Sequence, residues 1–158
     1  MRFGFLPVVL LATGCFYSPL VQPPEPRVDD RIEVRSAKVN EFVSLVNRHR
    51  QKIGCPSLVW DPAIAAVAQA HSTDMMTNRF YSHENRRGQS PFDRLAAAEI
   101  AFARAAENIS RGQTTAQQVL NTWLDSSGHR RNIEECRYTR HGVGLAATYW
   151  THVFVGER

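Results

Sequence analysis

The sequence predicts an α+β fold, an α-β-α sandwich with a small antiparallel sheet between helical layers. Three observations support this fold class. Apolar residues recur at helical spacing in the first half of the chain, Asp61-Pro62 and Ser90-Pro91 are strong helix-start signals, and the C-terminal region is rich in β-forming residues. The chain has 158 residues, of which 43% are hydrophobic and 22% charged, the composition of one ordinary globular domain.

The elements can be placed in order along the chain. Helices are expected at about 37–53 and 62–78, the second with Asp61 as cap and Pro62 at its first position. Two further helices are expected to begin at Ser90 and at about Thr115. Near the C-terminus, two β-rich segments form an antiparallel hairpin, and a short third strand is expected before them; they lie at 143–147, 149–155 and 107–109.

The N-terminus resembles the signal of a bacterial lipoprotein. Arg2 supplies a positive charge, residues 3–14 form an apolar run too short to span a bilayer, and small residues lead into Cys15. We therefore expect residues 1–14 to be removed as a signal peptide and Cys15 to carry lipid. Cleavage by an ordinary signal peptidase, which would give a secreted protein, and an uncleaved anchor are the alternatives.

A proline-rich segment separates this signal from the folded domain. Four prolines between positions 19 and 26 favour extended structure, so residues 15–35 are predicted to be a tether and residues 36–158 a single domain. No run of about 18 apolar residues occurs, which excludes a conventional transmembrane helix.

The three cysteines also fit export. If Cys15 carries lipid, Cys55 and Cys136 remain to form a disulfide in an oxidising compartment. Two buried free thiols are the alternative. Neither cysteine has a second cysteine or a histidine two to four residues away, so the two are not predicted to form a metal site.

The formal net charge of +4 comes from scattered arginines, with no aromatic residues interleaved. This pattern argues against a nucleic-acid partner and mildly favours anionic ones, such as lipid head groups or wall polymers.

Several polar residues are candidates for chemistry. His49 and His71 lie on apolar helix faces and are expected to be satisfied core residues, whereas His83, Glu107, His129 and His152 are expected in loops or short strands. Their spacing matches no local metal motif. Ser90 is better explained as a helix cap than as a nucleophile, because the glycine that a nucleophile elbow requires two positions later is missing.

Taken together, five segments resemble the bacterial branch of the CAP superfamily, whose domain is also called the SCP domain and occurs in cysteine-rich secretory, antigen 5 and pathogenesis-related proteins. The segments follow the family order over about 40–156 and lie at 60–75, 81–94, 106–109, 123–133 and 142–154. The resemblance implies an α-β-α sandwich with a central cavity.

The resemblance also implies a candidate site. In eukaryotic members two histidines and two glutamates line the cavity and can bind a divalent metal such as zinc. His83 and Glu107 match the first histidine and the first glutamate, while His129 lies near the position of the second glutamate and Tyr149 matches the second histidine. His83, Glu107 and His129 are thus a possible zinc site, or they hydrogen-bond one another and hold three loops together.

Two expectations follow for the histidines. His152 shares a strand face with Trp150 and Phe154 and should therefore point away from the cavity that Tyr149 faces. Histidines beside a carboxylate should titrate near or above pH 6.5.

For function, the sequence favours a lipid-anchored extracytoplasmic protein that binds a lipid, a cell-wall fragment or a protein in its cavity, as a monomer and without a settled enzymatic reaction. A metal-dependent hydrolase with Glu107 as general base is one alternative, and a purely structural envelope module is another.

Overall fold

The computed structural model describes residues 28–157, with side chains from residue 37 onward. The predicted signal peptide, the lipidated Cys15 and most of the predicted tether lie outside this range. Among the described residues, no helix has the length and apolarity needed to cross a membrane.

The first helix is longer than its apolar spacing predicts. α1 runs from Val28 to Lys52, so residues 28–35, predicted to be extended tether, form its first turns. Their sequence explains the difference, because Pro26 is the last proline before position 56 and nothing from Val28 onward interrupts a helix.

Four strands form one mixed sheet in the order β1-β3-β4-β2. β3 and β4 form the predicted antiparallel hairpin, and β2 pairs antiparallel with β4. β1 pairs with β3 in parallel. The sheet is therefore mixed, whereas the sequence predicted a purely antiparallel one. The strands are β1 (Val59–Trp60), β2 (Arg104–Arg111), β3 (Arg140–Ala146) and β4 (Tyr149–Gly156).

The predicted helix starts are confirmed by their caps. Asp61 accepts from the backbone N–H groups of Ala63 and Ile64 at the start of α2 (Pro62–Thr77). Reciprocal capping boxes begin both α3 (Pro91–Ala97) and α4 (Ala116–Asp125).

Two elements were not predicted. α5 (Ser127–Glu134) follows α4 almost without a break, and its cap residue Ser126 makes no side-chain capping bond, so the sequence carries no start signal. β1 has only two residues, too few to show alternation. His129 therefore lies on a helix and not in a loop.

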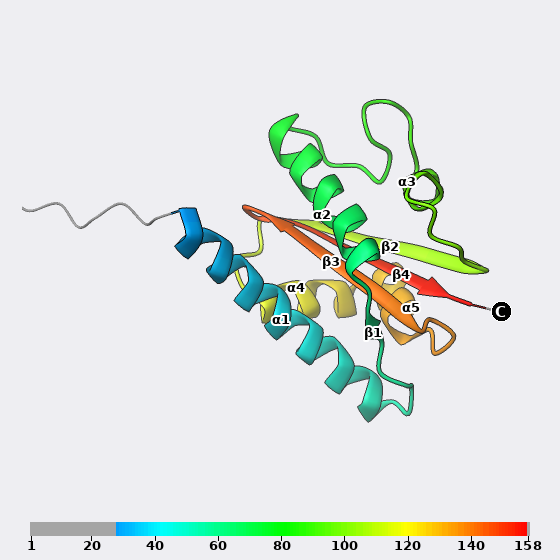
Figure 1. Ribbon diagram of the computed structural model, residues 1–158. Helices are drawn as coiled ribbons and strands as arrows, with labels where there is room; N and C mark the ends of the chain where they lie inside the picture. Colours follow the sequence, from blue (N-terminus) through cyan, green and yellow to red (C-terminus); the bar gives the residue numbers. More distant parts are fainter. Residues whose placement is uncertain (1–27, 158) are drawn as a thin grey trace, which may run out of the picture.

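The helices cover both faces of the sheet, as predicted for a sandwich (Figure 1). One core, around Phe42, Trp123 and Trp150, lies between the sheet and the layer of α1, α4 and α5. The other, around Ile64, Leu95 and Val153, lies between the sheet and the layer of α2 and α3. Two glycines let α2 lie directly on β3, because a Cβ at Gly142 or Gly144 would lie within 2.4 Å of the α2 backbone.

The predicted disulfide joins Cys55 to Cys136, whose Cα atoms are 5.0 Å apart. Beside it lies Arg50, which is fully buried and donates to four backbone carbonyls. The acceptors are Pro56 O at 2.9 Å, Ile133 O at 2.7 Å, Glu135 O at 3.0 Å and Tyr138 O at 3.1 Å. Arg50 and the disulfide thus fasten the end of α1 to the segment before β3.

Candidate functional site

Glu107 is the centre of a buried polar cluster at the edge strand β2. It lies opposite Val153 in the β2–β4 register, and Val153 belongs to the core under α2 and α3. Only 7% of Glu107 is exposed. Its Oε2 accepts from Arg94 Nη2 at 2.7 Å, and its Oε1 accepts from His83 Nδ1 at 2.8 Å. Both carboxylate oxygens are therefore engaged.

His83 is oriented by this contact. A carboxylate only accepts, so Nδ1 of His83 carries the hydrogen and Nε2 of the neutral ring is an acceptor. The side chain is 49% exposed, whereas that of Glu107 is 2% exposed. The buried carboxylate of Glu107 thus fixes the orientation of the His83 ring, which is half exposed to solvent.

His71 approaches the same carboxylate from α2. Its Nε2 lies 3.9 Å from Glu107 Oε1 and 2.9 Å from the carbonyl oxygen of Ser82, to which it donates. Burial lowers the pKa of His71, and the charge of Glu107 opposes this only in part. The ring is therefore neutral at pH 7. Its Nδ1 is buried and has no partner among the described residues.

His129 reaches the site from α5. Asn108, next to Glu107 on β2, donates to the carbonyl oxygen of His129 at 3.0 Å and accepts from Asn132 at 2.8 Å, which fixes α5 to the strand. Burial, and secondarily the charge of nearby His83, lower the pKa of His129. The expectation that the site histidines titrate near or above pH 6.5 is wrong for His129, because burial and the charge of His83 both lower the pKa of its ring.

A hollow of about 320 Å³, which we call the His129 cleft, lies where β2, α4 and α5 meet. Its lining includes Tyr81, Ser110, Arg111, Gln113, Trp123 and His129. Tyr81 is 48% exposed and donates to the carbonyl oxygen of Ile109, which also accepts from Trp123 Nε1. The Nδ1 atom of His129 is buried and unpartnered within the described range. The cleft therefore combines aromatic side chains with one unpartnered polar atom and several polar side chains, as ligand sites commonly do.

The sequence of this domain matches the model of a known family. The model of the cysteine-rich secretory protein family, CAP, matches residues 43–156. The chain belongs to the CAP family.

Two proteins of Bacillus subtilis are similar to this chain in sequence. The Bacillus subtilis protein YkwD is 36% identical over 124 residues, which cover 77% of this chain and 48% of YkwD. The Bacillus subtilis membrane protein YlbC is 33% identical over 123 residues, which cover 78% of this chain and 36% of YlbC. The chain thus spans about half the length of these relatives or less.

Solved structures share the fold. An extracellular protein containing an SCP domain from Bacillus anthracis is similar at a TM-score of 0.80 and 30% identity, over 85% of this chain and 45% of that one. An outer surface protein from Borrelia burgdorferi is similar at a TM-score of 0.72 and 20% identity, over 77% of this chain and 94% of that one. The second likeness shows the fold alone.

The predicted zinc ligands do not gather into a metal-holding set. His83 and Glu107 are in contact, but among the described residues no three His, Cys, Asp or Glu side chains are placed to hold a metal ion. Arg94 also occupies Oε2 of Glu107 and supplies the positive charge that a cation would bring. The donor set of this CAP domain therefore does not fit zinc at Glu107.

The remaining predicted site residue, Tyr149, lies at the rim of the sheet. It pairs with Arg111 in the β2–β4 register, and the Arg111 guanidinium lies 5.7 Å from the centre of its ring. Arg111 lines the His129 cleft, so Tyr149 supports a wall residue of that cleft.

His152 points away from Glu107, as strand parity predicts. It faces α1 and α4, where its ring packs against Phe42 and Trp123, and its Nε2 lies 2.9 Å from His141 Nδ1. Both histidines are fully buried, and burial lowers the pKa of His141 to about 4 and that of His152 well below its usual value. This pair belongs to the core and not to the site.

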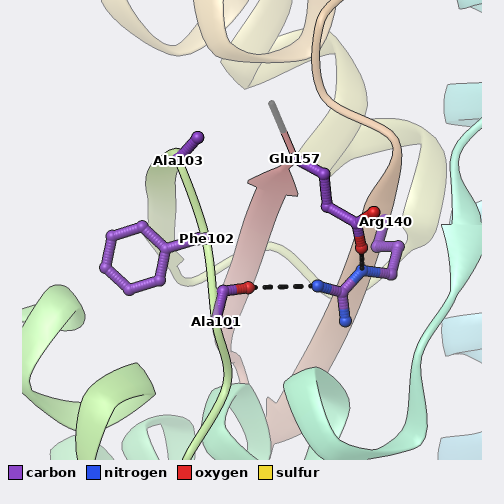
Figure 2. Close-up of a pocket in the computed structure, with 5 residues that line it drawn as sticks. All are labelled: Ala101, Phe102, Ala103, Arg140 and Glu157. Atoms are coloured by element: carbon purple, nitrogen blue, oxygen red, sulfur yellow. Dashed lines mark hydrogen bonds and ion pairs between the residues drawn. The ribbon is translucent and has the colours of Figure 1, made fainter.

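Another hollow, of about 280 Å³, lies at the opposite end of β2 and is lined by Ala101–Ala103, Arg140 and Glu157 (Figure 2). Arg140 donates to Ala101 O at 3.1 Å and pairs with Glu157 at 3.1 Å and with Asp61 at 2.6 Å. Its charge is therefore neutralised within the chain, and this hollow has little capacity for binding a charged ligand.

Sequence reasoning missed two members of the site. Arg94 lies in the α3 helix that the capping signal at Ser90 predicts, one residue after Asp93 of the capping box. His71 was expected to be a satisfied core residue; it is buried, but it also contacts the Glu107 cluster and leaves one nitrogen free. His49 is not in the core, because it pairs with Glu134 at 2.9 Å and its side chain is 23% exposed.

Proposed function

We propose that this CAP domain is exported, is held at a membrane by lipid on Cys15, and binds a ligand in the His129 cleft. The observation that carries the binding function is the cleft itself. Its lining brings together Tyr81, Trp123 and His129, whose buried Nδ1 has no partner among the described residues. A polar atom without a partner beside aromatic side chains favours recognition of a ligand.

Export is supported by the disulfide and by the relatives. A bond between Cys55 and Cys136 persists in oxidising compartments outside the cytoplasm. The Bacillus anthracis relative is described as extracellular and YlbC as a membrane protein. A lipid anchor at Cys15 is consistent with both descriptions, and it accounts for the third cysteine, which is not part of the disulfide. A cell-envelope component, whether lipid or wall fragment, is therefore the expected ligand.

The binding function is favoured over the hydrolase. Glu107 would have to take a proton as general base, yet both of its oxygens already accept hydrogen bonds, from Arg94 and His83. Arg94 also forms an ion pair with Oε2 of Glu107, which an activating metal would have to displace. A purely structural module remains the alternative that the following experiment separates.

Native purification followed by extraction tests binding in the cleft. The full chain, purified in mild detergent from its own envelope, should release a bound small molecule on denaturation. Tyr81→Ala should lose it, whereas Phe92→Ala should keep it, because Phe92 is also 48% exposed but does not line the cleft. Equal yields from the two variants, or no released molecule from the wild type, would contradict the proposal.

A further inference from the structure

A separate hollow of about 560 Å³ follows the outer face of α2, and we call it the α2 groove. One wall is α2, with His71 and Asp74, and the other is the segment 78–90, which leaves the end of α2 and returns to α3 (Figure 1). Arg94 of α3 also lines it. Among the residues that line the groove, only Ala70 has a wholly apolar side chain, and each of the others brings at least one polar group.

The segment wall is held in one shape by its own hydrogen bonds. Asn85 Oδ1 accepts from the backbone N–H groups of Arg87 at 3.0 Å and of Gln89 at 2.9 Å. Asn85 Nδ2 donates to Gln89 Oε1 at 2.9 Å, and Gly88, with a φ of 76°, completes the turn. The exposed Arg87 guanidinium and the Gln89 amide nitrogen are thus carried on a preorganised loop.

Two residues that line the groove carry one unused acceptor and one unused donor. His71 donates to Ser82 O through Nε2, so the lone pair of its buried Nδ1 is an acceptor. Arg94 Nε–H is a buried donor without a partner in the described part of the chain. A buried polar atom without a partner destabilises the fold, and a ligand group that hydrogen-bonds to it removes that cost.

The charges in the groove nearly balance. Arg94 is paired with Glu107, and Arg87 on one wall is opposed by Asp74 on the other. Asp74 accepts from Asn78 through Oδ1, which leaves Oδ2 as a further acceptor. The groove therefore favours a ligand without net charge that both donates and accepts hydrogen bonds.

We propose that the α2 groove binds a neutral polyhydroxylated ligand, a glycan chain. A hydroxyl both donates and accepts through its oxygen, so the hydroxyls of one glycan can bond to His71 Nδ1 and to Arg94 Nε, which belong to two residues that line the groove. A carboxylate or phosphate only accepts, and an ammonium only donates. Guanidinium, amide and carboxylate side chains on the walls can each bond two neighbouring hydroxyls.

This inference adds a second site to the proposed function and does not depend on what fills the His129 cleft. His71 and Arg94 contact Glu107 from the groove side, whereas Tyr81 and His129 line the cleft. Variants at Arg87 and at Tyr81 therefore separate the two sites.

The test is a calorimetric titration of the full chain in detergent with two neutral trisaccharides, triacetylchitotriose and maltotriose. We expect at least one to bind saturably, and Arg87→Ala to weaken its binding about tenfold, the loss expected for a hydrogen bond to a charged group. Arg131→Ala is the matched control, because Arg131 is also exposed but lies on α5, across the sheet, and should leave affinity unchanged.

A second readout needs no substitution. The ¹⁵N resonance of His71 Nδ1 should shift on titration as its lone pair accepts a hydrogen bond. The proposal is overturned if neither trisaccharide binds or if an uncharged alanine tripeptide binds in their place. It is also overturned if binding survives Arg87→Ala unchanged while Tyr81→Ala abolishes it, which would place the sugar in the His129 cleft.

Discussion

Arg94 donates to Glu107 across 2.7 Å, between two side chains that are 9% and 2% exposed. A buried pair of this kind contributes little over an apolar pair, but removing one partner leaves a buried charge uncompensated. The arginine therefore determines both the stability of the cluster and the chemistry open to Glu107.

Arg94→Ala should lower the free energy of unfolding by about 3–5 kcal/mol, because Glu107 would be left as an unpaired buried carboxylate. Arg140→Ala is the control, since Arg140 and Asp61 form a pair that is 27% and 18% exposed and should cost about 1 kcal/mol. Denaturant unfolding monitored by Trp fluorescence measures both. Equal losses in the two variants would contradict the buried-pair account.

Zinc should not bind saturably at His83 and Glu107 in the wild-type chain at neutral pH. The reason is the pairing of Glu107 Oε2 with Arg94, which a cation would have to displace. The histidine ring signals in an NMR titration provide the measurement. A saturable shift of the His83 signals that His83→Ala abolishes would restore the metal site and contradict the geometry described.

Because His141 and His152 are buried, we expect the stability of the domain to fall in acid. Burial, and secondarily the charge of Arg50, lower the pKa of His141 to about 4, against an unfolded value of about 6.5. The unfolded chain therefore binds more protons between these values, so stability is full above about pH 6.5 and falls as the pH drops toward 4. For His141 alone the loss is about 3 kcal/mol.

Unfolding free energies measured between pH 7 and pH 4 test whether stability falls as the pH drops. His152→Gln removes one titrating ring and should flatten the curve in part, leaving the contributions of His141, His71 and His129, whose pKa values are also lowered. A variant whose pH dependence matches that of the wild type would show that His152 does not contribute to the acid sensitivity.

Trp123 should matter far more to stability than Trp60. Trp123 is fully buried, packs edge-on against Phe42 at 5.3 Å and donates to Ile109 O, so Trp123→Ala should cost about 3–5 kcal/mol. Trp60 is 40% exposed on the edge strand β1, and Trp60→Ala should cost no more than about 1 kcal/mol. Thermal melting measures the stability of both variants. Similar melting midpoints would contradict the burial of Trp123 in the core beside α4.

Local signals predicted most of the fold. Helix starts at Asp61, Ser90 and Thr115 depend on side chains that bond to backbone a few residues away, and such bonds are visible in sequence. α5 has no capping bond, and β1 is two residues long, so neither leaves a local pattern to detect.

The site was predicted only in part, and not from local signals. The family resemblance brought out His83 and Glu107, which are in contact. Arg94 and His71 come from α3 and α2, and only tertiary packing brings them to Glu107. His141 shows the same limit: it meets His152 from the neighbouring strand, eleven residues away, and no local pattern distinguishes it.

Native mass spectrometry of the chain purified from its own envelope tests the central proposal, a lipid-anchored ligand binder, most directly. We predict a chain that begins at Cys15 with a diacylglyceryl group on that residue, and an additional non-covalent mass that dissociates on activation and is absent from Tyr81→Ala. A chain with an unmodified Cys15, or one that carries no bound mass in the wild type, would contradict the account.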